Sequence, residues 1–187
     1  MSGIMLPAWT TTDDQKGNSM LRVESGTFVC GNSLVTYRGF SPGDIVYRLT
    51  DVKTIDSPSF RTIQVGKHKH VDDLEILAFL NHSCRPNTHI IIDNDELVIV
   101  AASVISPGED LTFFYPATEW DMAQPFRCLC NAQNCLGFIA GAKHLPEDVL
   151  DRHPLSKHIQ QLIAESRHHP QLHDDAVLGR TPATVDE

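Results

Sequence analysis

The sequence has no long apolar run. Nowhere in its 187 residues does a window approach the ~18 consecutive apolar residues that a membrane span needs, so we expect no membrane partner. The N-terminus, MSGIMLPAWTTTDDQ, lacks the basic start and long apolar core of a secretory signal. There is also no internal repeat. These absences predict an intracellular protein, either cytoplasmic or nuclear.

Positive charge is scarce. The chain has 15 lysine and arginine residues against 24 aspartate and glutamate residues, a formal net charge of -9 at pH 7. Phosphate repels such a chain, so we expect no direct binding to nucleic acid. The charge is compatible with a cationic partner, such as a lysine-rich peptide.

Five cysteines stand out against these absences. In a reducing compartment they are expected to bind metal or to be plainly buried, because disulfides are disfavoured there. Three of them form the C-x-C-x4-C cluster CLCNAQNC, namely Cys128, Cys130 and Cys135. A structural zinc site needs four thiolate or imidazole ligands, and a short loop seldom supplies more than three. The fourth ligand must come from elsewhere, and the candidates are Cys84, Cys30 and His144.

Short β-branched runs separated by glycine, proline, serine or aspartate occupy the first two thirds of the chain. Residues 90–93 and 97–101 are joined by a turn-like NDE and predict a β-hairpin. Further strands are expected at residues 26–31, 44–49 and 61–65. The pattern predicts a mainly β fold.

Two helices are expected. Residues 71–80, VDDLEILAFL, have apolar positions at helical spacing and lead into Asn81. A second helix is expected after Pro154, with one apolar face formed by Leu155, Ile159, Leu162 and Ile163. The remaining C-terminal residues have no such face, so we predict a disordered tail.

Three motifs follow one another in the chain. The first, FLNHSCRPN, places four polar groups, Asn81 to Cys84, directly after an apolar segment and before Pro86. The second is GEDLTFFYP, and the third is the cysteine cluster. In order and spacing they resemble three signatures of the SET-domain family, whose best-known members are lysine methyltransferases that use S-adenosylmethionine. The resemblance covers roughly residues 21–141.

The resemblance implies an architecture. It is a mainly β SET-domain β-clip of short strands, with a pseudoknot formed by the Asn-His-x-Cys segment, a zinc-binding post-SET loop and a C-terminal helix. We therefore predict five segments: an N-terminal extension at 1–20, the SET domain at 21–115, the post-SET zinc region at 116–143, a C-terminal helical segment at 144–167 and a disordered tail at 168–187.

The resemblance also implies the ligands of the metal. The cysteine of the first motif joins the three of the post-SET loop, so the Zn2+ ligands are expected to be Cys84, Cys128, Cys130 and Cys135. Cys30 is left as a buried thiol.

Roles in cofactor binding and catalysis are implied in the same way. Tyr115 matches the tyrosine that closes the methyl-transfer pore, and Phe113 matches the position that sets how many methyl groups fit. S-adenosylmethionine is expected to contact Gly26, Asn81 and His82, with Phe138 and Ile139 packing on its adenine.

Several positions depart from the family pattern. The Gly-x-Gly turn near the N-terminus is ESG here, with Glu24 at its start and only Gly26 retained. Ala78 replaces an arginine, Phe114 replaces an acidic residue, and the segment that grips a peptide in larger members is short. The resemblance implies an S-adenosylmethionine-dependent methyltransferase acting on a protein lysine. The alternative is a SET scaffold adapted to small-molecule biosynthetic chemistry or to non-catalytic binding.

Overall fold

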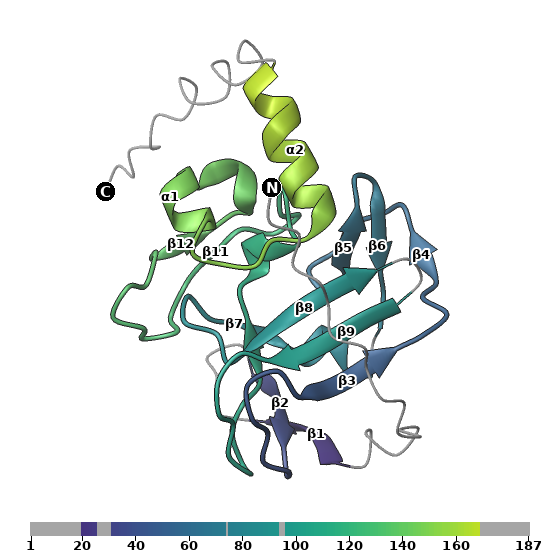
Figure 1. Cartoon of the computed structure of the whole chain (residues 1–187), viewed down its shortest axis with the longest axis vertical. Coiled ribbons are helices and arrows are strands. Elements are labelled where there is room, and N and C mark those ends of the chain that lie inside the picture. The colour runs from purple at the N-terminus through teal and green to yellow at the C-terminus, as the bar shows by residue number, and fades with distance from the viewer. Residues whose placement is uncertain (1–19, 26–30, 74, 94–95, 169–187) are drawn as a thin grey trace, which may run out of the picture.

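Short β-strands make up most of the secondary structure in the computed structural model, which describes residues 20–25, 31–73, 75–93 and 96–168 (Figure 1). The strands are β1 (Leu21–Ser25), β2 (Asn32–Thr36), β3 (Ile45–Leu49), β4 (Thr54–Ile55), β5 (Ile63–Gly66), β6 (Lys69–Val71), β7 (Asn81–His82), β8 (Thr88–Asp93), β9 (Glu96–Ala101), β10 (Thr112–Phe113), β11 (Phe126–Arg127) and β12 (Phe138–Ile139). The helices are α1 (Glu147–Leu150) and α2 (Lys157–His168), with 3-10 turns at Leu77–Phe79, Tyr115–Ala117 and Ala142–His144. The mainly β prediction is confirmed. None of the helices in these ranges is long and apolar enough to span a membrane.

A three-stranded sheet in the order β3-β9-β8 lies in the middle of the molecule. Its β8–β9 hairpin is antiparallel, with Ile90 opposite Ile99 and Asp93 opposite Glu96. Both isoleucines are buried, as expected for β-branched residues on the inner face of a sheet. The predicted hairpin is confirmed, and the strand predicted at 44–49 corresponds to β3.

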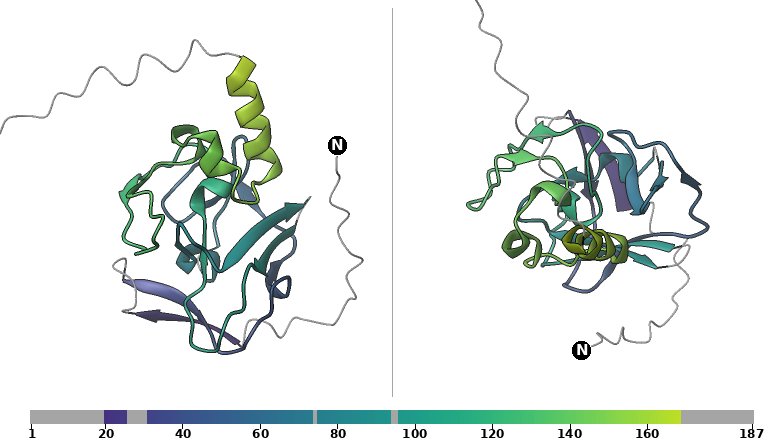
Figure 2. Two further views of the ribbon diagram at one scale, coloured as in Figure 1. Left: turned by 60° about the vertical axis from the view of Figure 1, so that its left-hand side comes forward. Right: turned by 90° about the horizontal axis from the view of Figure 1, so that it is seen from above.

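Two smaller sheets flank this one, β1-β2 and β4-β6-β5. The strand predicted at 61–65 corresponds to β5, which begins two residues later. The strands form several small sheets rather than one large one (Figure 1 and Figure 2). In Figure 1, β1 and β2 lie at one end of the molecule and α2 at the other.

A parallel pairing joins two very short strands from distant parts of the chain. In β7 and β10, Asn81 is aligned with Thr112 and His82 with Phe113. Parallel strands need a long connection, and here the β8–β9 hairpin lies between them in the sequence. The pairing agrees with the predicted pseudoknot, and it places the Asn-His-Ser-Cys segment beside the residues that lead into Tyr115.

Two apolar cores hold these elements together. The larger one lies among the strands and includes the fully buried Leu34 and Leu111. The smaller one packs the C-terminal segment, through Leu150 and Ile159, against Phe114. The C-terminal helical segment is thus joined to the chain immediately before Tyr115 by apolar contact.

The helix predicted at residues 71–80 is wrong. Val71 belongs to β6, where it pairs with strands on both sides, and only the 3-10 turn Leu77–Phe79 follows. The side chain of Asp73 accepts a hydrogen bond from the backbone N–H of Ile76 at 3.0 Å, a local turn that competes with helix. Helical spacing in the sequence was therefore overridden by strand pairing at one end and by a side-chain turn in the middle.

The C-terminal helix is confirmed, but it starts later than the proline suggests. The helix α2 begins at Lys157, because the N–H of Ser156 donates to the carbonyl of Ala117 at 2.9 Å. Ile159 and Leu162 are buried as predicted. The sequence did not indicate α1.

Some predictions fall outside the described residues. These are almost all of the N-terminal extension at 1–20, the strand at 26–31 and the tail at 168–187. The boundaries proposed between segments stay predictions.

Candidate functional site

Four cysteines from two distant segments meet at one point. Their Sγ atoms all lie within 4.8 Å of one another, and those of Cys84 and Cys128 are 3.9 Å apart. Four thiolates around a tetrahedral ion with metal–sulfur bonds of about 2.3 Å would be about 3.8 Å apart. The cluster of Cys84, Cys128, Cys130 and Cys135 therefore fits a metal ion and could hold one. His144 is not part of it, since its ring pairs with Asp121.

The backbone around the cluster turns sharply at two positions. Asn131 and Gly137 have positive φ angles of 55° and 75°, which lets the chain turn sharply inside and after the cysteine loop. Two backbone N–H groups point at sulfur, from Leu136 to Cys84 at 3.4 Å and from Cys84 to Cys130 at 3.5 Å. With no cation present, burial raises the pKa of the Cys84 thiol to about 12. A bound divalent cation would offset the cost of burying the charged sulfur and favour the thiolate.

A cavity of about 660 Å³ lies next to the cysteine cluster. It is within the range of cofactor and ligand sites. Asn81 and His82 line it, and Cys128 and Cys130 form its edge on the side of the cysteine cluster. Asn81 is held by a hydrogen bond from its side-chain amide to the carbonyl of Asn32 at 2.9 Å. Further lining residues that the sequence did not indicate include Phe60, Arg61, Met122, Gln124 and Phe126.

His82 connects the metal cluster to the tyrosine. The backbone N–H of Tyr115 donates to Nδ1 of His82 at 3.2 Å, so the imidazole proton lies on Nε2. That Nε2 faces the Sγ of Cys84 at 3.3 Å. Burial, together with the nearby His153 ring, lowers the pKa of His82 to about 3, so the imidazole is neutral at physiological pH.

Tyr115 lies where two cavities meet. It lines the cavity of about 660 Å³ and also a narrow one of about 30 Å³. Its hydroxyl donates to the carbonyl of Leu80 at 3.1 Å, and its ring lies 4.7 Å from that of Phe113 between centroids.

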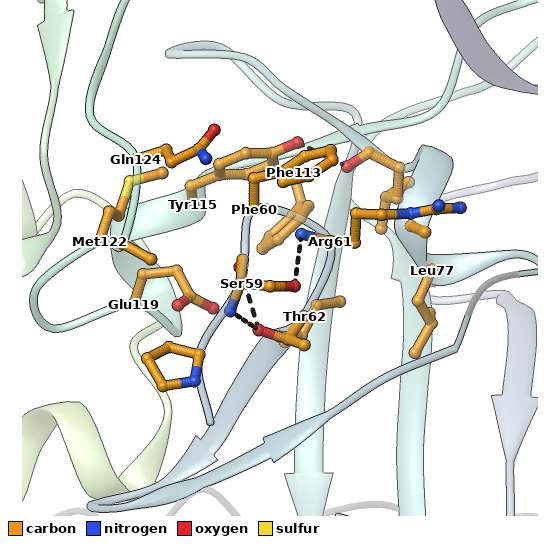
Figure 3. Close-up of a pocket in the computed structure, with 15 residues that line it drawn as sticks. Ser59, Phe60, Arg61, Thr62, Leu77, Phe113, Tyr115, Glu119, Met122 and Gln124 are labelled. Carbon is orange, nitrogen blue, oxygen red and sulfur yellow. Dashed lines mark hydrogen bonds between the residues drawn. The ribbon is translucent and has the colours of Figure 1, made fainter. Parts of the chain in front are cut away.

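The narrow cavity is shown in Figure 3. The rings of Tyr115, Phe60 and Phe113 gather at its upper side in this view, with Met122 and Glu119 on one side. Phe113 is 3% exposed and lines this cavity but not the larger one, so its size limits the space beside Tyr115. The role implied for Phe113 by the resemblance, setting how many methyl groups fit, stays a prediction.

The substituted positions are explained by their surroundings. Phe114, which stands where the family has an acidic residue, stacks on the ring of His153 with centroids 3.8 Å apart. Ala78, in place of an arginine, lines both cavities and leaves them open. Arg61 lines both as well and thus supplies a cation from another segment.

Other predicted site residues do not reach the cavities. Phe138 is 58% exposed, and Ile139 is fully buried against Cys84 and Cys128. Neither lines the larger cavity, where Phe126, paired with Ile139 across β11 and β12, is the aromatic on that side. Packing of Phe138 and Ile139 on an adenine therefore has no support from this arrangement. Gly26 and Cys30 lie outside the described residues.

Comparisons with known proteins agree with the fold. The SET domain family profile matches residues 11–116, more than half of the chain. Methyltransferase flvH of Aspergillus flavus is 31% identical over 159 residues, which cover 85% of this chain and 88% of that protein. The H3 lysine-36 specific histone-lysine N-methyltransferase of Saccharomyces cerevisiae is 35% identical over 86 residues, which are 41% of this chain and only 12% of that enzyme.

A solved structure gives the same fold. KRYPTONITE in complex with mCHG DNA and SAH has a TM-score of 0.52 and 21% identity, over 63% of this chain and 28% of that one. The mainly β architecture, the paired β7 and β10 strands and the cysteine cluster define a SET-type fold with a post-SET loop. The chain belongs to the SET-domain family of methyltransferases.

Proposed function

We propose that this protein transfers a methyl group from S-adenosylmethionine to an aliphatic amine. The observation that carries the proposal is the position of Tyr115, whose hydroxyl is anchored on the Leu80 carbonyl at the wall shared by a large and a narrow cavity. Methyl transfer is an in-line displacement at carbon, so it needs a donor and an acceptor that meet at one point.

The larger cavity is the proposed site for S-adenosylmethionine. Asn81 and His82 line it, and its volume suits a nucleoside-sized ligand. The solved KRYPTONITE complex contains SAH, which supports this choice for a shared fold. Gly26 stays a predicted contact, and Arg61 is a candidate partner for the carboxylate of the methionine moiety.

The cysteine cluster is the proposed Zn2+ site. Four thiolates make a closed site without an open position, which suits a structural ion rather than a catalytic one. Its role here is to order the loop that carries β11 and β12, and with it the wall formed by Phe126.

Catalysis at this site consists of positioning. No side chain acts as nucleophile, because the amine itself attacks the methyl carbon. Tyr115 orients the amine and the methyl group through its hydroxyl oxygen, and the carbonyl of Leu80 holds that hydroxyl in place. With phenylalanine rather than tyrosine at Phe113, the narrow cavity lacks a second hydroxyl, so the proposed products include dimethylated or trimethylated amine.

A protein lysine is the first candidate acceptor. Relatives are named as H3 lysine-36 specific enzymes, and a net charge of -9 favours a basic peptide. This chain spans only 12% of the Saccharomyces cerevisiae enzyme, so that enzyme's substrate is not carried over. A small-molecule amine is the second candidate, because the relative matched along most of both chains is flvH, whose name specifies no histone. A cytoplasmic or nuclear location stays a prediction.

Radiolabelled transfer tests this proposal. Zinc-loaded protein would be incubated with methyl-tritiated S-adenosylmethionine and either mixed histones or a protein-free extract of small molecules. Label in the histone fraction supports the lysine reading, and label in an extracted amine supports the second. If the labelled product in the extract is a methylated alcohol or carboxylate and no amine is labelled, the amine assignment is wrong. If no fraction accepts any label, the methyl-transfer proposal fails.

A further inference from the structure

A single carboxylate lies in the narrow cavity. Among the described residues that line it, Glu119 and Arg61 are the only charged ones, and most of the others are apolar or aromatic. The cavity volume of about 30 Å³ is about the space of one water molecule in the liquid. It has room for a small group, such as an amino nitrogen with its substituents, beside Tyr115 and Phe113 (Figure 3).

Glu119 is held from one side. Its Oε1 accepts hydrogen bonds from the backbone N–H of Gln64 at 2.7 Å and from the hydroxyl of Thr118 at 3.3 Å. The next residue is fixed as well, since the N–H of Trp120 donates to the side-chain oxygen of Gln64 at 2.8 Å. Within the part of the chain that the structure describes, both hydrogen bonds to the carboxylate go to Oε1. The second oxygen, Oε2, is left for a ligand.

The charge is costly at this position. Burial raises the pKa of Glu119 to about 7, and the hydrogen bonds from Gln64 and Thr118 offset only part of that rise. A glutamine could accept the same N–H of Gln64 without this cost. The hydrogen bonds therefore do not require a carboxylate at this position. What the carboxylate adds is a negative charge and a proton acceptor inside the cavity.

We propose that Glu119 receives the acceptor amine in its ammonium form and takes its proton before methyl transfer. The inference rests on the proposed function, because it assigns the acceptor side of the same site. An N–H bond of the ammonium breaks, and an O–H bond forms at Oε2 of Glu119. The neutral amine then attacks the methyl carbon beside Tyr115 while the carbon–sulfur bond of the sulfonium breaks. The proton on Glu119 leaves to solvent.

This role defines a substrate class. The acceptor is a cationic aliphatic amine with at least one N–H hydrogen to donate, whether it is a lysine side chain or a free small molecule. Alcohols and carboxylates of the same shape are not accepted, because they have no positive charge for Glu119 to bind.

Ligand binding tests the proposal without any turnover. The probes are n-butylammonium, 1-butanol and butyrate, titrated by NMR into the zinc-loaded full chain at about pH 8, where a primary amine is still protonated. The titrations are run with and without S-adenosylhomocysteine, so that a failure to bind cofactor, which would count against the proposed function, is seen separately. The variants are Glu119→Gln, which keeps the oxygen that accepts from Gln64, and Asp121→Asn, which removes an exposed carboxylate on the same segment.

We expect wild type and Asp121→Asn to bind n-butylammonium about tenfold or more tightly than 1-butanol, with butyrate weakest. Glu119→Gln should lose most of this preference while keeping its cofactor affinity. Equal binding of n-butylammonium and 1-butanol by wild type would overturn the proposal without reference to any variant. An unchanged preference in Glu119→Gln would show that the carboxylate is structural. If Glu119→Gln does not fold, the comparison within wild type still decides.

Discussion

At the scale of single residues, Tyr115 joins the features of the site. Its backbone N–H holds His82, its hydroxyl is held by the Leu80 carbonyl, and its ring lies between the two cavities. Through His82 it is also connected to Cys84 and the metal cluster. A change in the cluster is therefore expected to alter the backbone position of Tyr115.

Tyr115→Phe tests the hydroxyl alone. The ring still fills its space, so the midpoint of unfolding and the affinity for cofactor should stay close to those of wild type. Turnover should fall about 100-fold or more, because the hydroxyl acts on the reacting groups in the transition state. Steady-state kinetics on the identified acceptor, with calorimetry of cofactor binding as control, measures this. A variant as active as wild type would show that the hydroxyl has no part in the reaction.

Glu119→Gln also tests whether the pKa of Glu119 affects the pH dependence of the unfolding free energy. The pKa of Glu119 in the folded protein is raised to about 7 from 4.5, so the folded state holds a proton that the unfolded state has lost between those pH values. The stabilising contribution of the protonated acid is complete below pH 4.5 and is lost as pH rises through 7. Urea unfolding of both proteins at pH 5 and pH 8 should show wild type losing about 1–3 kcal/mol relative to the variant on going to the higher pH. A constant difference between the two proteins would contradict the raised pKa.

The site was only partly predictable at this scale. Asn81, His82, Phe113 and Tyr115 could be found because they stand in contiguous motifs, and the structure places them at the cavities. Glu119 could not, because an acidic residue four positions after a tyrosine carries no signal until the fold brings it into the cavity that Phe113 also lines. The same is true of the other cavity residues, which come from loops.

At the scale of elements, the loop carrying β11 and β12 is the one that we expect to depend most on a bound metal. Its two strands are two residues each, and its apolar cluster is small and includes the cysteines themselves. Such a segment buries too little apolar surface to offset the entropy of ordering it. The metal cluster is therefore expected to be a main source of its order.

Cys128→Ser should remove the metal. Elemental analysis is expected to show about one zinc per chain for wild type and much less for the variant, since three ligands make a weaker site. Hydrogen exchange should become faster between residues 120 and 141 and stay slow in the β8–β9 hairpin. Cys30→Ser is the matched control, because the ligand set implied by the family resemblance leaves Cys30 out. Full zinc content in Cys128→Ser would rule out the assigned ligand set.

Gly141 sets a close backbone contact next to Glu119. Its φ is 111°, and a Cβ there would lie 2.5 Å from the carbonyl oxygen of Trp120. Gly108, with a φ of 88°, has open space around the same position. Gly108→Ala should cost about 1–2 kcal/mol of unfolding free energy from backbone strain alone, and Gly141→Ala about 1–3 kcal/mol more, from displacing Trp120. Urea denaturation measures both, and equal losses would mean that the contact is easily relieved.

Elements were predicted well where pairing and periodicity agree. The β8–β9 hairpin has β-branched runs on both sides of a short turn, so its pattern and its contacts indicate the same structure. Residues 71–80 have a helical period, but Val71 is taken by β6 and Asp73 forms a local turn. No pattern within residues 71–80 could reveal that competition. Val71 is drawn into β6 by pairing with β5, a separate segment that precedes it in the sequence.

At the scale of the whole molecule, the C-terminal segment compensates for a departure from the family pattern. Phe114 stands where an acid is expected, and it is buried in the smaller core with Ile159 and stacked on His153. Some residues of that core are close in the sequence to Tyr115 and to Glu119. The helix α2 is thus expected to support Tyr115 and Glu119 from behind, although it lines neither cavity.

The central claim is that the cavity between the metal cluster and Tyr115 binds S-adenosylmethionine. Isothermal titration calorimetry of the zinc-loaded full chain tests it most directly. We predict one site per chain with a dissociation constant in the range of about 1–100 μM, weaker than a complete glycine turn would give, together with a rise in the unfolding midpoint. An absence of binding heat and of any thermal shift at about 1 mM ligand, in protein shown to be folded and zinc-loaded, would contradict the account.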